Sequence, residues 1–277
     1  MSVENTPNNW REMSNINEII KDSSINVEPI YKVQTDAFGV FDYPFLINTI
    51  KNHNIKNFLD VGTGDGMFLI KLAQKVNNVI FHGIDINKYL IDKCKAITDC
   101  LVLNINFSQA HFGVDKLKSN YDLIMARFAI EHIKEEHDID IFLTTAYEKL
   151  SSNGIFIIIE YYIHELDIED SIWKEFRNRE MVMYKNTFVH PRIALKLPSR
   201  LKAAKFRNIK SIINHVSPST IDDKYFYSLV KEYTKLYKQI SPEVWPDEIS
   251  NKILLWCEKQ QPIGEPIFFT THTIAQK

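Results

Sequence analysis

The sequence predicts an α/β protein with a doubly wound, mostly parallel sheet, and three observations support this prediction. Short apolar strands alternate with helical patterns from residue 55 onward. The strand at Ile155–Glu160 is apolar on both faces, as expected for a parallel strand covered by helices on either side. Three of the 8 glycines stand within five positions between the first strand and the first helix. Alternation of this kind is typical of consecutive βαβ units.

The alternation continues to residue 160. Phe68, Leu72 and Val76 recur at helical spacing, and Leu90 and Cys94 share one face of the next helix. We predict strands at Asn57–Val61, Val79–Ile84, Leu101–Phe107, Tyr121–Arg127 and Ile155–Glu160, and helices at Asp65–Val76, Asn87–Ile97 and Asp138–Leu150.

The pattern changes after residue 160. Asp170–Lys185 is mixed and charged, and Pro198–Lys205 predicts a short helix. Two further strands are predicted at Asn208–His215 and Pro266–Ala275. The segment Ser217–Gly264 between them is rich in aromatic residues and is too long for a structureless loop. It predicts a helix of its own from the spacing of Tyr225, Leu229, Tyr233 and Leu236.

Composition excludes several functional classes. The 277 residues carry a formal net charge of −2, so bulk charge indicates neither a nucleic-acid partner nor an anionic membrane. The longest apolar run, Ile155–Ile159, is too short to cross a bilayer. The amino terminus lacks a basic-then-apolar signal pattern, and the three cysteines are odd in number. We expect a cytoplasmic protein with reduced thiols.

The glycine-rich loop predicts a nucleotide-like ligand with a cationic end. Strand, glycine turn and helix form a ligand site at the carboxyl edge of open α/β sheets. The third glycine, Gly66, comes one residue early for a dinucleotide fingerprint, and no Lys-Ser/Thr pair of a phosphate loop follows. Asp60 and Asp65 flank the glycines, and two carboxylates beside a pyrophosphate would be electrostatically unfavourable. A positively charged ligand group fits this loop better.

An acid at the tip of the second strand completes this pattern. Asp85 ends the segment His82–Asp85 and lies 19 residues after Gly66. An acid about 20 residues beyond such a loop accepts both hydroxyls of a ribose. The alternative is that Asp85 caps the helix that begins near Asn87.

From these residues the chain resembles class I S-adenosylmethionine-dependent methyltransferases of the small-molecule type, over about residues 55–160. The likeness rests on four motifs in order: the loop Asp60–Gly66, the acid Asp85, the strand Tyr121–Phe128, and Leu150–Ile159 as helix end, turn and fifth strand. It implies a Rossmann-like, seven-stranded sheet with an antiparallel last strand and helical cap insertions. It also implies S-adenosylmethionine as cofactor and S-adenosylhomocysteine as product.

The resemblance assigns an organisation and a set of cofactor contacts. Residues 1–50 would form an N-terminal helical segment or lid, residues 51–165 the cofactor-binding core, and residues 166–277 the rest of the sheet with acceptor-binding insertions. The loop would wrap the methionine part, Asp60 would face its ammonium group, Asp85 would hold the ribose and Ile86 would lie beside the adenine. His111 stands where the family usually has an acid near the adenine. The implied cofactor residues are Asp60, Gly62, Thr63, Gly64, Gly66, Asp85, Ile86, His111, Phe112, Arg127 and Phe128.

Catalytic and acceptor contacts are predicted more loosely. Glu131 and His132 follow the fourth strand. His132 is a candidate general base, because the pKa of a histidine lies near neutrality. The alternative is that both residues only pack at the start of a helix. His132 and His137 are five apart, so we expect no metal site. The candidate acceptor contacts, which could equally be lid, surface or solvated-helix residues, are Tyr31, Tyr161, Tyr162, Trp173, Arg177 and His190.

The predicted reaction is in-line methyl transfer to an oxygen or nitrogen of a small, partly apolar acceptor, by a monomer or homodimer. Enzymes that methylate amino groups of nucleic acids, or of glutamine in proteins, typically carry the motif Asn/Asp-Pro-Pro-Tyr after the fourth strand. This chain has Ala126–Ala129 at that place, and it also lacks the Pro-Cys pair of cytosine-methylating enzymes there. Three alternatives stay open: a reaction of the same fold that uses the cofactor without methylation, a protein methyltransferase, and a non-catalytic protein that binds the cofactor.

Overall fold

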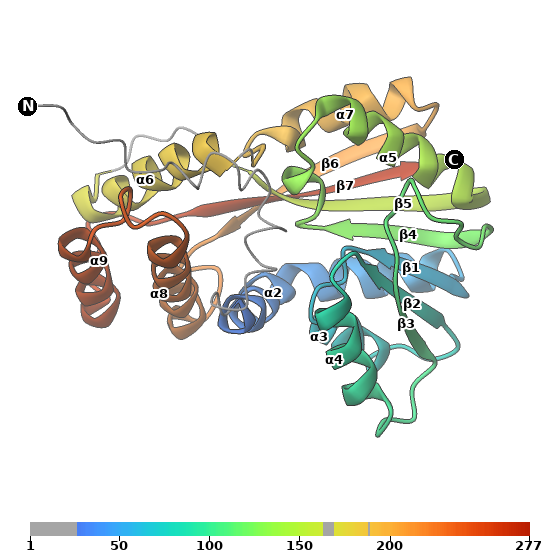
Figure 1. Cartoon of the computed structure of the whole chain (residues 1–277), viewed down its shortest axis with the longest axis horizontal. Helices are drawn as coiled ribbons and strands as arrows, with labels where there is room; N and C mark the ends of the chain where they lie inside the picture. The colour runs from blue at the N-terminus through green and yellow to red at the C-terminus, as the bar shows by residue number, and fades with distance from the viewer. Residues whose placement is uncertain (1–26, 163–168, 188) are drawn as a thin grey trace, which may run out of the picture.

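The computed structural model describes residues 27–162, 169–187 and 189–277, and its central feature is a seven-stranded sheet (Figure 1). The strand order is β3-β2-β1-β4-β5-β7-β6. The first five strands pair in parallel, and β7 is antiparallel to both neighbours. This confirms the predicted fold class. The strands are β1 (Asn57–Val61), β2 (Ile80–Asp85), β3 (Ile105–Gln109), β4 (Tyr121–Arg127), β5 (Leu150–Tyr162), β6 (Arg207–Val216) and β7 (Phe268–Gln276).

Helices cover both faces of the sheet. One apolar layer joins the sheet to α2, α3 and α4, and the layer on the other face joins it to α5 and α7. The strands β4 and β5 between them are almost wholly buried, which explains their apolar character on both faces. The helices of these layers are α2 (Glu28–Asn52), α3 (Met67–Ala73), α4 (Lys88–Thr98), α5 (Glu136–Lys149) and α7 (Ile193–Ala203).

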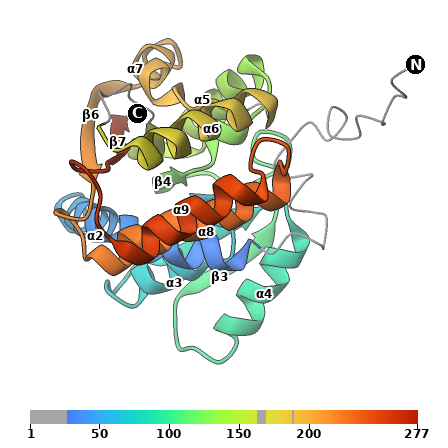
Figure 2. The same cartoon turned by 90° about the vertical axis from the view of Figure 1, so that its left-hand side faces the viewer.

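A third apolar cluster lies beyond the carboxyl end of β4 (Figure 1). It is built by α6 (Ser171–Thr187), α8 (Asp223–Ile240) and α9 (Asp247–Lys259), together with the first turns of α2. Figure 2 shows α8 and α9 side by side across this end of the molecule. Tyr233 and Leu236 belong to the buried face of α8, so the helix predicted from their spacing is confirmed. These helices form a cap over the edge of the sheet where ligands bind in open α/β folds.

Several predicted boundaries differ from the structure. The helix predicted at Asp65–Val76 begins only at Met67, because Gly66 takes a left-handed conformation as its N-cap. The helix predicted to begin at Pro198 starts five residues earlier, with Pro198 inside it. The mixed segment Asp170–Lys185 is mostly the helix α6, since its buried residues share one face.

The amino-terminal prediction is only partly tested. Residues 1–26 lie outside the described part of the chain, and residues 28–52 form the single long helix α2. The division of the chain at residues 50 and 165 stays a prediction. Among the described residues, no helix is both long and apolar enough to span a membrane.

Candidate cofactor and acceptor site

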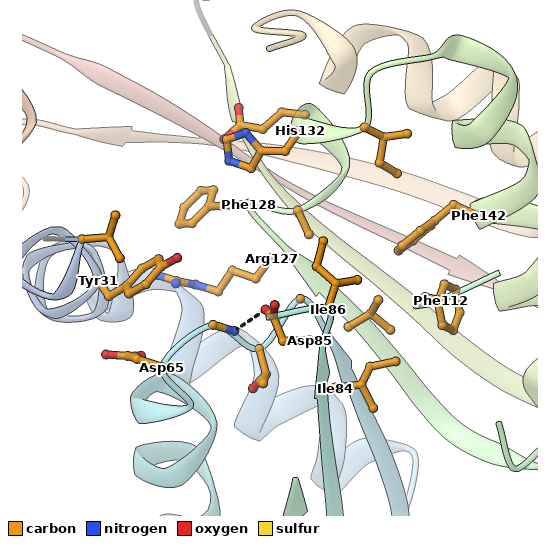
Figure 3. Close-up of a pocket in the computed structure, with 18 of the residues that line it drawn as sticks. Tyr31, Asp65, Ile84, Asp85, Ile86, Phe112, Arg127, Phe128, His132 and Phe142 are labelled. Carbon is orange, nitrogen blue, oxygen red and sulfur yellow. Dashed lines mark hydrogen bonds and ion pairs between the residues drawn. The ribbon is translucent and has the colours of Figure 1, made fainter. Parts of the chain in front are cut away.

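A cavity of about 610 Å³ lies at the carboxyl ends of β1, β2 and β4, beneath α2 and α8. Figure 3 shows residues of the glycine loop, the second strand and the fourth strand facing this space from different sides. Twelve residues singled out from the sequence line it together: Tyr31, Gly62, Thr63, Gly64, Asp85, Ile86, His111, Phe112, Arg127, Phe128, Glu131 and His132.

The three loop glycines share a left-handed backbone conformation, but Gly64 and Gly66 differ in what surrounds them. All have positive φ, at 75°, 58° and 71° for Gly62, Gly64 and Gly66. A Cβ on Gly66 would stand 2.7 Å from the sulfur of Cys94, so this glycine lets helix α4 pack closely. A Cβ on Gly64 would find its nearest neighbour, the Tyr31 ring, only at 3.7 Å. Gly66 is therefore a packing residue outside the cavity lining, whereas Gly64 faces the cavity.

Asp85 couples the second strand to the glycine loop. Its Oδ2 accepts a hydrogen bond from the Gly64 amide at 3.0 Å (Figure 3), and its Oδ1 accepts one from the Asn87 amide at 2.8 Å. Asn87 itself is the N-cap of α4, so Asp85 does not fill that role. Each carboxylate oxygen retains acceptor capacity toward the cavity. Burial raises the pKa of Asp85, while the three backbone amides that donate to its carboxylate oppose this rise.

Asp60 is a buried acid with an unpaired oxygen. It is 3% exposed on β1, and its Oδ1 has no hydrogen-bond partner among the described residues. Burial raises its pKa from 3.8 to about 7, although the nearby Arg127 guanidinium opposes this rise. Asp60 does not itself line the cavity. An uncompensated carboxylate at this depth fits a site that receives a cationic group, because the pairing would offset the cost of burial.

The side of the cavity beyond Asp85 is apolar. Ile84, Ile86, Phe112 and Phe142 gather there in Figure 3, and the rings of Phe112 and Phe142 lie 4.7 Å apart. Such a slot suits a flat aromatic base. His111 also lines the cavity but is exposed, and its backbone amide donates to the Asp115 carboxylate at 2.7 Å.

Arg127 is held rigidly by buried partners. Its Nε donates to Asp42 Oδ2 at 2.8 Å, and Asp42 Oδ1 lies 2.7 Å from His272 Nε2. The guanidinium carbon lies 4.2 Å from the ring centroid of Phe68 and 4.5 Å from that of Phe128. Phe128 has a φ of 51°, which is an unusual value for a bulky residue, and it lines the cavity. The charge of Arg127 is thus neutralised by Asp42 beside the cavity.

Glu131 and His132 lie in the short 3-10 helix η2 (Ile130–His132). Glu131 is 7% exposed and its Oε2 has no partner among the described residues. Burial raises its pKa, and the neighbouring Glu160 and Glu180 raise it further. Burial lowers the pKa of His132 from 6.5 to about 4, so this imidazole is neutral near pH 7. The near-neutral pKa expected from the sequence does not apply, because water does not solvate the charged ring.

Five predicted acceptor residues lie outside the cavity lining, because they pack beneath or beside it. Arg177 donates to the Tyr161 hydroxyl at 2.8 Å and pairs with Glu180 inside the cap. Trp173 stacks on Phe176 in the cap core. The remaining two, Tyr162 and His190, contact other parts of the protein: the Tyr162 ring lies 6.1 Å from that of Phe269, and His190 Nε2 is 3.1 Å from the Lys134 carbonyl.

Other lining residues were not singled out as site residues. Tyr184 of α6 and Tyr233 and Tyr237 of α8 face the cavity from the cap, and Gln34 faces it from α2. The aromatic composition of the segment Ser217–Gly264 was the available signal, but helical spacing alone does not separate cavity-facing tyrosines from core tyrosines. Within the described ranges, no group of three or more His, Cys, Asp or Glu side chains is arranged to hold a metal ion.

Comparison with protein families gives one model described as a methyltransferase domain, which matches residues 52–238. A carboxy-S-adenosyl-L-methionine synthase of Nautilia profundicola is 29% identical over 118 residues. That alignment covers 40% of this chain and 50% of the synthase, so the chain matches only half of that relative's length.

Solved structures with the same fold include enzymes of different named activities. A putative sarcosine dimethylglycine methyltransferase of Galdieria sulphuraria superposes with a TM-score of 0.56 at 15% identity, over 86% of each chain. A Haemonchus contortus phosphoethanolamine N-methyltransferase 2 in complex with S-adenosyl-L-methionine gives 0.54 at 16% identity, over 80% of this chain and 48% of that one. The [4+2]-cyclase SpnF gives 0.53 at 17% identity, over 80% and 74%. At these identities the likeness shows the fold alone.

Proposed function

The chain belongs to the methyltransferase domain family, and from this premise we propose that it transfers a methyl group from S-adenosylmethionine to a nitrogen or oxygen of a small, partly apolar acceptor. S-adenosylmethionine, when bound, supplies a methyl group activated by a sulfonium. The observation that carries the proposal is one continuous cavity that joins the Asp85 side to the polar and aromatic wall of the cap.

We propose these roles for the cofactor residues. Asp85 accepts hydrogen bonds from the ribose hydroxyls, and the backbone of the loop around Gly64 approaches the methionine part. Ile86 and Phe112 enclose the adenine in the apolar slot. Asp60 faces the ammonium group from behind the loop, directly or through a water molecule. The orphaned Asp60 oxygen, the open space above Gly64 and the apolar slot support this fit.

The protein contributes orientation more than acid–base chemistry. Positioning a nucleophile in line with the reacting bond and excluding bulk water can lower the barrier by about 7–11 kcal/mol. The ring of Phe128, fixed between Arg127 and Phe38, forms part of the wall at the end of β4. His132 is neutral and Glu131 is buried, so both can take part in proton transfer without exposure to bulk solvent.

The test is to incubate the purified protein with S-adenosylmethionine and a panel of small amines, alcohols and phenols, and to analyse products by mass spectrometry. We expect an acceptor heavier by one methyl group and one equivalent of S-adenosylhomocysteine per transfer. Cofactor binding with no turnover on any acceptor would contradict methyl transfer and favour a binding protein.

A second candidate is a reaction on the cofactor itself, favoured by the match to a relative named carboxy-S-adenosyl-L-methionine synthase. The same mass analysis separates the two reactions, provided that a carboxylic acid able to donate the carboxyl group is added to the panel. Here the cofactor would become heavier, and no S-adenosylhomocysteine would accumulate.

Cofactor affinity should depend on pH through Asp60. Its pKa of about 7 means that the carboxyl group is protonated in acid and ionised above neutrality. Only the ionised form attracts the ammonium group, so we expect the affinity for S-adenosylhomocysteine to fall by about tenfold from pH 7.5 to pH 5.5. Calorimetric titration at several pH values measures this change. An equally steep fall in Asp60→Asn would assign the effect to another group.

A further inference from the structure

The cavity has a second end, which we call the acceptor compartment. It is lined by Phe128, Glu131 and His132 from the segment after β4 and by Tyr184, Tyr233 and Tyr237 from α6 and α8. Burial raises the pKa of Tyr184 and of Tyr233, and Glu131 is close enough to both tyrosines to raise these pKa values further. The compartment therefore combines one buried carboxyl group with several aromatic rings.

The hydrogen bonds of the tyrosine hydroxyls determine whether the acceptor compartment presents donors or acceptors to a ligand. The hydroxyls of Tyr184 and Tyr237 lie 3.0 Å and 2.8 Å from Glu180 Oε1, and they lie 3.0 Å from each other, so their two protons serve these three contacts. A tyrosine hydroxyl has a single proton, so its remaining capacity is that of an acceptor. Glu180 itself is paired with Arg177, so its charge is already compensated. Tyr184 and Tyr237 both line this end of the cavity, and their hydroxyl oxygens have only acceptor capacity left for a ligand. Tyr233 differs, because its hydroxyl accepts from Gln34 Nε2 at 2.8 Å.

Glu131 is the carboxyl group that lacks such compensation. Its Oε1 is 3.7 Å from His132 Nε2, beyond hydrogen-bond distance, and its Oε2 is buried with no partner among the described residues. Burial raises the pKa of Glu131, and the neighbouring Glu160 raises it further. Of the cations that line the cavity, Arg127 is paired with Asp42, and Lys134 is only half-buried.

We infer that the acceptor is an amine, whose nitrogen hydrogen-bonds to the Glu131 carboxylate and to the hydroxyl oxygens of Tyr184 and Tyr237. This inference rests on the proposed methyl transfer and narrows it to nitrogen. A carboxylate acceptor would face a buried carboxyl group and two lone pairs. An ammonium group supplies the donors that these oxygens lack, its charge favours the ionised form of Glu131, and aromatic rings add a favourable interaction with a cation.

The same arrangement provides a base for the proton that the ammonium group must lose before its nitrogen can react. A primary ammonium gives one proton to the Glu131 carboxylate, which leaves a lone pair on its nitrogen. That lone pair forms the bond to the methyl carbon as the carbon–sulfur bond breaks, with its electron pair left on sulfur. The product is a secondary ammonium, and the proton stays on Glu131 until it leaves with the products. The raised pKa of Glu131 favours this uptake, since it makes the carboxylate a stronger base.

The experiment compares three probes of similar size on the protein saturated with S-adenosylhomocysteine: phenethylamine, 2-phenylethanol and 3-phenylpropionate. Calorimetry should show the amine binding at least tenfold more tightly than the alcohol, and no binding of the carboxylate. In Glu131→Gln the amine should lose at least tenfold in affinity, with the affinity for S-adenosylhomocysteine unchanged. The matched control is Glu258→Gln on the exposed side of α9, which should leave all affinities unchanged.

Three results would overturn the amine assignment. The first is an alcohol or carboxylate that binds the wild-type complex as tightly as the amine does. The second is that the amine does not bind at all, and the third is a folded Glu131→Gln variant that keeps the amine affinity. Failure of S-adenosylhomocysteine to bind the wild-type protein would instead contradict the proposed function itself, so the two failures are distinguishable.

Discussion

Replacing Asp85 by alanine is expected to weaken S-adenosylhomocysteine binding at least about 100-fold while the fold stays intact. A hydrogen bond to a charged group contributes roughly 1.5–3 kcal/mol, and the ribose would lose two of them. The variant also removes the acceptor of the Gly64 amide, so the loop loses a constraint as well. A loss of about 3 kcal/mol corresponds to more than a 100-fold change in the dissociation constant.

Calorimetric titration of the variant with S-adenosylhomocysteine measures this loss, and circular dichroism checks the fold. Asp99→Ala is the matched control, because Asp99 is exposed at the far end of α4, the helix that follows Asp85 in the chain. It should bind as the wild type does. Wild-type affinity in Asp85→Ala would contradict the assignment of the ribose site.

The second large effect is expected on stability. Arg127→Met removes the partner of Asp42, whose side chain is fully buried. Breaking a buried ion pair by removing one partner typically costs about 3–5 kcal/mol, because the remaining charge is left uncompensated. His272 still contacts Asp42, but the contacts of the guanidinium with the Phe68 and Phe128 rings are also lost. We expect the free energy of unfolding in urea to fall by about this amount.

The control for Arg127→Met is a pair at the surface. Lys71 and Asp36 are 2.8 Å apart, with side chains that are 36% and 23% exposed. Lys71→Met should lower the free energy of unfolding by less than about 1 kcal/mol, because solvent screens exposed pairs. Equal losses in the two variants would show that the buried pair is not a special stabilising feature.

The part of the fold that follows local pattern could be predicted from the sequence. The predicted bounds of β1 and β4 match the structure, because each is a short, mostly apolar and mostly buried run. The third strand is shifted to Ile105–Gln109 from the predicted Leu101–Phe107, since apolar residues before Ile105 belong to the connection from α4. The first five strands and their connecting helices depend on short-range signals of this kind.

The cofactor side of the cavity was also predictable, but the acceptor side was not. The glycine loop and Asp85 lie within 30 residues of one another and have a characteristic spacing. The acceptor compartment instead depends on contacts between distant segments: the Tyr184 and Tyr237 hydroxyls are 3.0 Å apart across 53 residues. The Arg127–Asp42 pair spans 85 residues. No local pattern indicates such contacts, because tertiary packing alone brings these side chains together.

The lowered pKa of His132 illustrates the same limit. A histidine after the fourth strand suggests a base that titrates near neutrality. Its pKa falls to about 4 because the folded chain buries the ring away from water. Burial also raises the pKa of Glu131 and leaves its Oε2 without a hydrogen-bond partner among the described residues, which makes Glu131 rather than His132 the candidate base.

The most direct test of the central claim is a crystal structure of the protein with S-adenosylhomocysteine. We predict density for the whole nucleoside in the cavity, with both ribose hydroxyls at the Asp85 carboxylate, the adenine between Ile86 and Phe112, and the amino-acid end over the glycine loop. A structure at saturating ligand with this cavity empty, or with the nucleoside bound elsewhere, would contradict the account.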